Sequence, residues 1–244
     1  MSEKINLSEY TEFITKKTCE LLAVDSPTGY TKEAAKWVFD EFAALGFTGH
    51  ITTKGGILIC LGGASRDNAL LLEAHADTLG AIVQSVKSNG RLLLSPLGGM
   101  NPNNAETENV KIITKFNGEY EGTLQLNNAS LHVNGSYNDT KRTWNDVEVV
   151  IDENTASAED TKKLGIDAGD IICFEPNTRV TKSGYIKSRF LDDKLSVGIL
   201  LGYAKYLKDH NITPQRTVYV HVTVYEEVGH GGCASVPDGV TEAI

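Results

Sequence analysis

The sequence contains no apolar run that approaches the roughly 20 residues of a transmembrane helix. Its first residues, MSEKINLSEY, also lack the apolar centre of a signal peptide. These two absences argue against a membrane partner, and we expect a cytoplasmic protein.

Basic residues are outnumbered by acidic ones. The 23 Lys and Arg residues stand against 32 Asp and Glu residues, which gives a formal net charge of -9. Nucleic acids and anionic membrane surfaces are held mainly through Lys and Arg. We therefore expect neither of them as a partner.

The sequence also lacks a CxxC pair, which argues against a zinc clip or a redox couple of that kind. We expect the cysteines to be reduced, buried thiols. They are Cys19, Cys60, Cys173 and Cys233.

What is present is a globular composition of 244 residues, 41% of them apolar. That length provides for one core of about 150 residues and a smaller second domain. Apolar residues recur at helical spacing over residues 8–24 and 31–45, and short apolar runs follow at residues 56–61 and 69–74. Two helices followed by buried strands predict the start of an α/β domain.

The pattern changes near Val83, where short strand-like runs and a hairpin turn at residues 88–90 begin. One helix is predicted inside this β-rich stretch, at residues 157–164, with Ser157 and Asp160 as a capping box.

A helical pattern over residues 194–207 and a strand over residues 216–225 then restore the α/β alternation. We predict an α/β fold in which a sheet with flanking helices is interrupted by an inserted β-rich domain. The sheet domain is expected at residues 1–84 and 185–244, and the insert at residues 85–184.

Three clusters of metal-ligand residue types lie at the ends of predicted elements, where open α/β sheets place their active sites. The first is LLEAHAD, residues 71–77. The two-residue period of a strand puts His75 and Asp77 on one side, so His75 would ligate a metal while Asp77 orients its ring. A purely structural role is the alternative, because a His-x-Asp pair often arises by chance.

The second cluster is SRFLDDK, residues 188–194, just before a predicted helix. A carboxylate such as that of Asp192 or Asp193 can bridge two cations about 3.5 Å apart. Helix capping is the alternative, although it accounts for one aspartate better than for two.

The third cluster is VYEEVGHGG, residues 224–232. Adjacent glutamates repel, so Glu226 and Glu227 at the end of a core strand are costly unless a cation neutralises them. One would be a ligand and the other a base, and a solvated surface turn is the alternative. His221 is interpreted as a packed or hydrogen-bonded histidine, and His230 as solvated.

Taken in order and spacing, HAD (75–77), LDDK (191–194) and EEVG (226–229) resemble the motifs of the glutamyl and deblocking aminopeptidases, two-metal peptidases that form tetrahedral dodecamers. The resemblance covers essentially the whole chain and includes SPTGY at residues 26–30. It implies the phosphorylase/hydrolase-like metallo-aminopeptidase sheet, a peptide substrate, and a homo-oligomer from dimer to dodecamer.

The resemblance also implies the roles of the site residues. His75 would bind one metal, Asp192 would bridge both metals, and Glu227 would bind the other. Glu226 would be the catalytic base and Asp77 the partner of His75. The cofactors would be two divalent metal ions, zinc or cobalt, with manganese as the alternative, and the peptide bond after Asp192 would be cis.

Two departures from the family pattern affect these expectations. Thr78-Leu79-Gly80 stands where the family usually has Glu-Ile-Gly, and residues 131–149 are longer and more polar than expected, so substrate preference would differ. The family also places an Asp after the Glu-Glu motif and a His near its C-terminus. The sequence ends at Ile244 before either, so we expect a C-terminally truncated chain with weak metal binding and little activity.

The expected function is a metal-dependent aminopeptidase that hydrolyses the N-terminal residue of peptides. One alternative is a related two-metal amidohydrolase or deacylase acting on modified small peptides, which would prefer N-acylated substrates. The other is a non-catalytic assembly or binding protein, against which the presence of both Glu226 and Glu227 argues.

Overall fold

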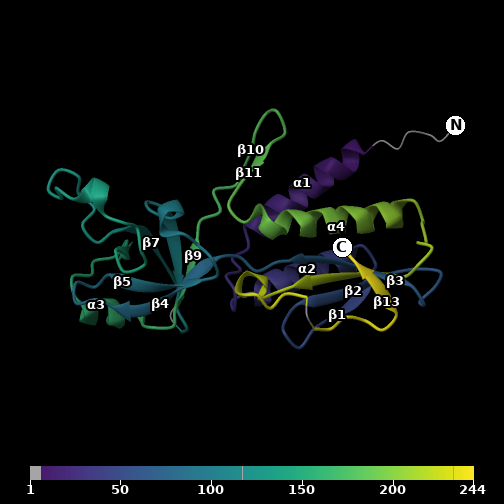
Figure 1. Ribbon diagram of the computed structural model, residues 1–244, viewed down its shortest axis with the longest axis horizontal. Helices are drawn as coiled ribbons and strands as arrows, with labels where there is room; N and C mark the ends of the chain where they lie inside the picture. The colour runs from purple at the N-terminus through teal and green to yellow at the C-terminus, as the bar shows by residue number, and fades with distance from the viewer. Residues whose placement is uncertain (1–6, 117, 233) are drawn as a thin grey trace. The chain divides into compact units, whose positions relative to one another are not determined.

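The computed structural model describes residues 7–116, 118–232 and 234–244. These residues form two compact units, whose helices and strands are labelled in Figure 1. One unit is built from the chain up to Thr78 together with Pro176–Ile244, and the other is Leu79–Glu175.

The first unit is a mixed sheet with helices on one face (Figure 1). Among the described residues its strand order is β1-β2-β12-β3-β13. β12 and β13 run parallel to β3, whereas β1 and β12 run antiparallel to β2. The elements are α1 (Ser8–Leu22), α2 (Lys32–Ala44), β1 (Thr48–Ile51), β2 (Ile57–Gly62), β3 (Ala69–His75), β10 (Arg179–Val180), β11 (Ile186–Lys187), α4 (Leu191–Asp209), β12 (Val218–Thr223), η3 (Glu226–Val228) and β13 (Val240–Ala243).

The core of this unit lies between α1, α2, α4 and the sheet. Helix residues one turn apart, such as Val38 and Phe42 of α2, are fully buried against alternate strand residues such as Ile57 and Ile59. Each such side chain contributes roughly 1.5–3 kcal/mol when it is buried. This core supports the central strands β3 and β12, whose carboxyl ends lead into two of the candidate clusters.

The second unit is a closed barrel with strand order β4-β5-β8-β7-β6-β9. Its interior is filled by aliphatic side chains such as Leu92, Leu94, Ile112 and Leu124, which are 0–1% exposed. The elements are β4 (Gly80–Val86), β5 (Leu92–Leu97), η1 (Pro102–Asn104), β6 (Asn109–Ile113), β7 (Glu119–Leu126), η2 (Tyr137–Asp139), β8 (Val147–Ile151), α3 (Ala158–Lys163) and β9 (Ile171–Phe174).

The predicted α/β class with a β-rich insert is confirmed. The capping box of α3 is also present, since the Asp160 N–H donates to Ser157 Oγ at 3.2 Å and Ser157 Oγ donates to Asp160 Oδ2 at 2.7 Å. The compact unit that holds the insert is Leu79–Glu175, so residue 84 lies inside β4, and residue 184 lies between β10 and β11 in the other unit.

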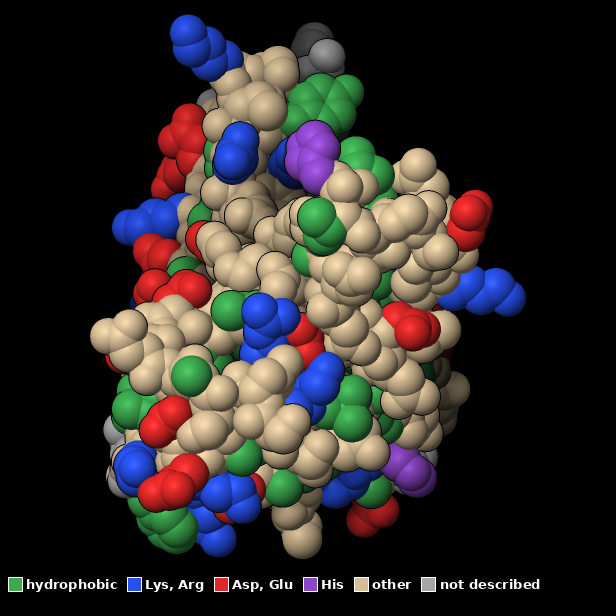
Figure 2. Space-filling model, turned by 90° about the vertical axis from the view of Figure 1, so that its left-hand side faces the viewer, with side chains coloured by type: hydrophobic (Ala, Val, Ile, Leu, Met, Phe, Trp, Pro, Cys, Tyr) green, Lys and Arg blue, Asp and Glu red, His purple; other side chains and the backbone are tan. Residues whose placement is uncertain are grey.

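Three of the four cysteines lie in the described part of the chain. Cys173 is buried and Cys19 and Cys60 are half-buried, whereas Cys233 lies outside the described residues. No helix in the described part of the chain is long and apolar enough to cross a membrane. On the face shown in Figure 2, acidic and basic side chains are interspersed and hydrophobic ones lie scattered.

Lys194 is a buried cation that joins α4 to the end of α1. It is 1% exposed, and its Nζ donates to the carbonyl oxygens of Leu21 at 3.1 Å and Val24 at 2.7 Å. Terminal helix carbonyls lack partners within the helix, so they need such a donor when buried. Lys194→Met is therefore expected to lower the free energy of unfolding by about 2–4 kcal/mol, measured by urea denaturation.

Lys208 provides the matched control for this substitution. Its exposed Nζ donates to the carbonyl of Ala44 at the end of α2, at 3.3 Å. Water replaces that contact, so Lys208→Met is expected to cost less than about 0.5 kcal/mol. Equal losses in the two variants would contradict a special role of the buried lysine.

Candidate metal-binding active site

His75 ends β3 with its ring held in one orientation. The side chain is 7% exposed, and Nδ1 donates to the backbone carbonyl of Asp77 at 2.9 Å. A carbonyl oxygen only accepts, so Nδ1 carries the hydrogen and the second ring nitrogen, Nε2, is the one available as a ligand atom.

Asp77 is fully buried and connects three segments. Its carboxylate accepts hydrogen bonds from Thr28 Oγ1 at 2.7 Å and from the N–H groups of Glu226 at 3.2 Å and Glu227 at 3.3 Å. It also lies 3.4 Å from His75 Nδ1. Burial alone would raise the pKa of Asp77, but these hydrogen bonds outweigh it and lower the pKa below the usual value.

The SPTG segment at residues 26–29 is the element that supports Asp77. Beside the Thr28 hydroxyl, Ser26 Oγ donates to the carbonyl of Ala76 at 2.7 Å. Two backbone hydrogen bonds join Thr28 to Thr78 and Thr78 to Ser26, at 3.1 and 2.9 Å. In the sequence this segment stands out only as part of the family motif, and no local pattern predicts its contact with Asp77.

The two aspartates in the first turn of α4 both contact His75. Asp192 Oδ1 is 3.1 Å from His75 Nε2, and Asp193 Oδ2 accepts from the backbone N–H of His75 at 3.3 Å. The peptide bond between the two aspartates is cis, as the resemblance implied. Both have non-helical backbone angles, and Phe190 at the N-cap position provides no capping side chain. The capping alternative therefore does not explain the pair.

The third segment is the turn that follows β12. Tyr225 has a left-handed backbone with φ of 72°, which turns the chain into η3. Glu226 Oε2 then lies 3.5 Å from His75 Nε2. Side chains from the end of β3, the start of α4 and this turn therefore meet around one nitrogen atom.

The electrostatics of the cluster reflect an excess of carboxylates. Burial opposes a charged His75 ring, but the hydrogen bonding and charge of Asp77 and the charge of Glu226 outweigh it and raise the pKa of His75 to about 9. Burial raises the pKa of Glu227 to about 7, and the nearby carboxylates add to this effect against the attraction of His75. A bound cation would relieve both shifts.

The donor set fits a divalent cation. With Nδ1 as the hydrogen donor, neutral His75 directs the lone pair of Nε2 towards Asp192 and Glu226, which is repulsive unless a proton or a cation lies between them. Two ligands of one tetrahedral ion at about 2.1 Å lie about 3.4 Å apart, close to the 3.1 Å between His75 Nε2 and Asp192 Oδ1. Across the described residues, however, no group of three or more His, Cys, Asp or Glu side chains is already arranged to hold a metal ion.

The other two histidines of this region lie outside the cluster around His75. His221 is 3% exposed and lies 2.9 Å from Glu73, so it is a hydrogen-bonded histidine, as interpreted from the sequence. His230 is exposed, and its backbone carbonyl accepts from Lys54 Nζ.

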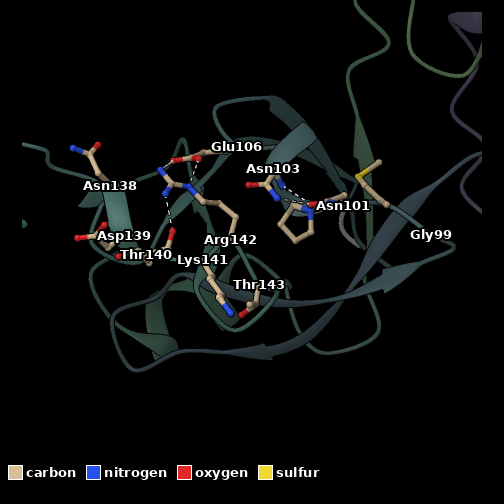
Figure 3. A pocket seen from close by; sticks show the side chains of 12 residues that line it. Gly99, Asn101, Asn103, Glu106, Asn138, Asp139, Thr140, Lys141, Arg142 and Thr143 are labelled. Atoms are coloured by element: carbon tan, nitrogen blue, oxygen red, sulfur yellow. Dashed lines mark hydrogen bonds and ion pairs between the residues drawn. The ribbon is translucent and has the colours of Figure 1, made fainter. Parts of the chain in front are cut away.

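The insert contains an open polar groove of about 900 Å³ between residues 99–106 and 138–143. Figure 3 shows Arg142 in this groove turned towards Glu106. Its Nε donates to Glu106 at 2.7 Å, and Nη1 donates to the carbonyls of Thr140 and Tyr137 at 2.7 and 3.1 Å. Because these donors bind within the same polar segment, we interpret Arg142 as fixing the loop rather than binding a ligand.

Known proteins resemble this chain in sequence and in fold. The model of the M42 glutamyl aminopeptidase family matches residues 55–244. The Bacillus subtilis (strain 168) protein YhfE, described as a proposed aminopeptidase, is 34% identical over 226 residues, which are 91% of this chain and 64% of that protein.

Solved structures share the fold. A TET aminopeptidase of the marine sediment archaeon Thaumarchaeota archaeon SCGC AB-539-E09 has a TM-score of 0.78 at 22% identity, over 92% of this chain and 60% of that one. The Pyrococcus horikoshii TET1 peptidase, described as assembling into a tetrahedron or a large octahedral shell, has a TM-score of 0.74 at 22% identity, over 88% and 62%. The chain thus spans less than two thirds of each of these proteins.

Proposed function

Because the chain belongs to the family of M42 glutamyl aminopeptidases, we propose that the whole protein is a metal-dependent aminopeptidase that hydrolyses the N-terminal residue of peptides. The observation that carries the proposal is the meeting of an imidazole and several carboxylates from three segments around His75 Nε2. Such a set of donors suits a divalent cation and little else.

The proposed role of each residue follows from its position in the cluster around His75. His75 and Glu227 would each hold one metal ion, Asp192 would hold both, and Glu226 would be the base. The backbone carbonyl of Asp77 accepts from the imidazole of His75, and its carboxylate accepts from the N–H groups of both glutamates, so one residue sets the spacing of the ligand and the base.

Two divalent cations, zinc or cobalt with manganese as the alternative, would lower the pKa of a shared water towards about 7 and polarise the scissile carbonyl group. The side chain of Glu226 is 53% exposed, so water and substrate have access to it. Its carboxylate takes the proton of the attacking water and passes it to the leaving amine nitrogen. His75 keeps its orientation throughout, because Nδ1 remains bound to the backbone carbonyl of Asp77.

A homo-oligomer is part of the same proposal. The support is family membership and the assembly described for the Pyrococcus horikoshii TET1 peptidase. Size-exclusion chromatography with light scattering on the whole protein tests it, and a monomer at micromolar concentration would contradict it.

Hydrolysis of matched peptides tests the activity. The whole protein is expected to release the first residue from peptides with a free N-terminus, to lose this activity with a chelator, and to regain it with zinc, cobalt or manganese. The competing function is that of a two-metal amidohydrolase. Cleavage of N-acetylated peptides but not of free ones would favour that function and contradict ours.

Asp77→Asn is expected to lower metal affinity and kcat/KM by about 10–100-fold. The amide is isosteric, but it lacks the negative charge that stabilises the ring of His75 and that accepts the N–H groups of the turn. Metal titration and peptide hydrolysis measure the effect. Asp209→Asn is the control, because Asp209 pairs with Lys205 at the other end of α4, and equal losses in the two variants would contradict the role of Asp77.

A further inference from the structure

A hydrogen-bonded pair, Glu73 and His221, lies beside the candidate site. The two residues are partners in the parallel register of β3 and β12, and His221 Nδ1 lies 2.9 Å from Glu73 Oε1. His221 is 3% exposed, and the side chain of Glu73 is 31% exposed. The buried imidazole therefore holds a carboxylate that extends to the surface of the sheet.

The Glu73 carboxylate meets the glycine-rich turn after Glu226 and Glu227. A Cβ atom at Gly232 would lie 2.2 Å from Glu73 Oε1 and 2.4 Å from Oε2, so no side chain fits there unless Glu73 moves. A Cβ atom at Gly231 would lie 3.2 Å from Cγ of Glu226. The two glycines thus run between the Glu73 carboxylate and the side chain of Glu226, where only a bare backbone passes.

Lys54 binds the backbone carbonyl groups of the same turn. Its Nζ donates to the carbonyl of His230 and, at 3.1 Å, to that of Gly231. The N–H of His230 donates in turn to the carbonyl of Tyr225 at 2.9 Å, directly before Glu226. Lys54 therefore holds the backbone to which Glu226 belongs, and the carboxylate of Glu73 lies against the same turn.

We propose that Glu73, held in place by His221, is a positioning residue that fixes the Gly231–Gly232 backbone and, through it, the carboxylate of Glu226. The inference rests on the proposed function, in which Glu226 is the base. Misplacing a reacting group by about 1 Å costs about 10²-fold in rate.

Glu73→Ala tests the inference on the whole protein with metal bound. It is expected to lower kcat by about 10–100-fold while KM and metal content remain near those of the parent protein, and Tm falls because the buried His221 loses its partner. Glu73→Gln is expected to retain most of kcat, because its amide oxygen still accepts from His221. Glu242→Ala is the matched control, since Glu242 lies on the adjacent strand β13 and pairs with Arg216. An unchanged kcat in Glu73→Ala, or a loss that follows metal content, would overturn the inference.

A double-mutant cycle tests the contact itself. Gly232→Ala is expected to lower kcat strongly when Glu73 is present, because the added methyl group collides with its carboxylate. The same substitution is expected to have little further effect in Glu73→Ala, where space has been made. Additive losses would mean that Glu73 does not fix this turn.

Hydrogen exchange separates this inference from the proposed function. Backbone amides of residues 226–232 are expected to exchange faster in Glu73→Ala than in the parent protein or Glu242→Ala, whether or not peptides are hydrolysed. Faster exchange in a protein without peptidase activity would refute the proposed function alone. Equal exchange rates would refute the positioning role.

Discussion

Glu226→Gln is expected to lower kcat by about 10²–10⁴-fold and to leave metal content, KM and Tm near those of the parent protein. Glutamine has the same shape as glutamate, but its amide does not accept and return a proton at neutral pH. The backbone N–H of residue 226 still donates to Asp77, so the turn is expected to keep its position. Peptide hydrolysis at saturating metal, with metal content measured on the same samples, provides the check.

Glu227→Gln is the neighbouring control for this prediction. Its backbone N–H donates to the same Asp77 carboxylate, but in our proposal its side chain is a ligand. Glu227→Gln is therefore expected to weaken metal binding and to regain part of its activity as the metal concentration rises. If Glu226→Gln behaved in that way and Glu227→Gln did not, the roles of base and ligand would be reversed.

Local periodicity is sufficient to predict the strands that lead into the site. The alternation of β12 and the apolar runs of β2 and β3 are visible in the sequence, because core burial selects residues at a fixed period. β1 was missed, because all four of its residues are exposed and carry no such alternation. β13 was missed for the same reason, since it is exposed over most of its length.

The candidate residues could be predicted by type and by position at the ends of elements, but their connections could not. Asp77 forms direct hydrogen bonds with Thr28, Glu226 and Glu227, which lie 49, 149 and 150 positions away along the chain. Such contacts depend on which strands become neighbours, and no local pattern specifies that. The part played by Thr28, the hydrogen bond of Asp193 to the His75 backbone and the pairing of Glu73 with His221 were all missed on this ground.

Metal affinity is expected to rise by about 10⁴-fold between pH 6 and pH 9. The metal-free protein holds a proton on His75 below about pH 9 and one on Glu227 below about pH 7. Binding of the two metal ions must displace both, so this change is in their overall affinity. Affinity should therefore rise about 100-fold per pH unit below pH 7 and about tenfold per unit from pH 7 to pH 9, and then level off. Calorimetry in buffers of different ionisation enthalpy counts the released protons, and a flat affinity over this range would contradict the prediction.

The same two groups determine how the stability of the protein changes with pH. Both folded-state pKa values lie above the usual values of 6.5 for His75 and 4.5 for Glu227, so the folded metal-free protein binds more protons than the unfolded chain. The contribution of Glu227 to the free energy of unfolding is then lost as the pH rises from about 4.5 to 7. The contribution of His75 is lost as the pH rises from about 6.5 to 9. Excess metal binds more tightly to the folded state over the same range, so it should oppose this loss. We therefore expect Tm to fall with pH up to about pH 9 in a chelator, and in saturating metal to rise up to about pH 6.5 and then to level off, a difference that a cluster without metal affinity would not show.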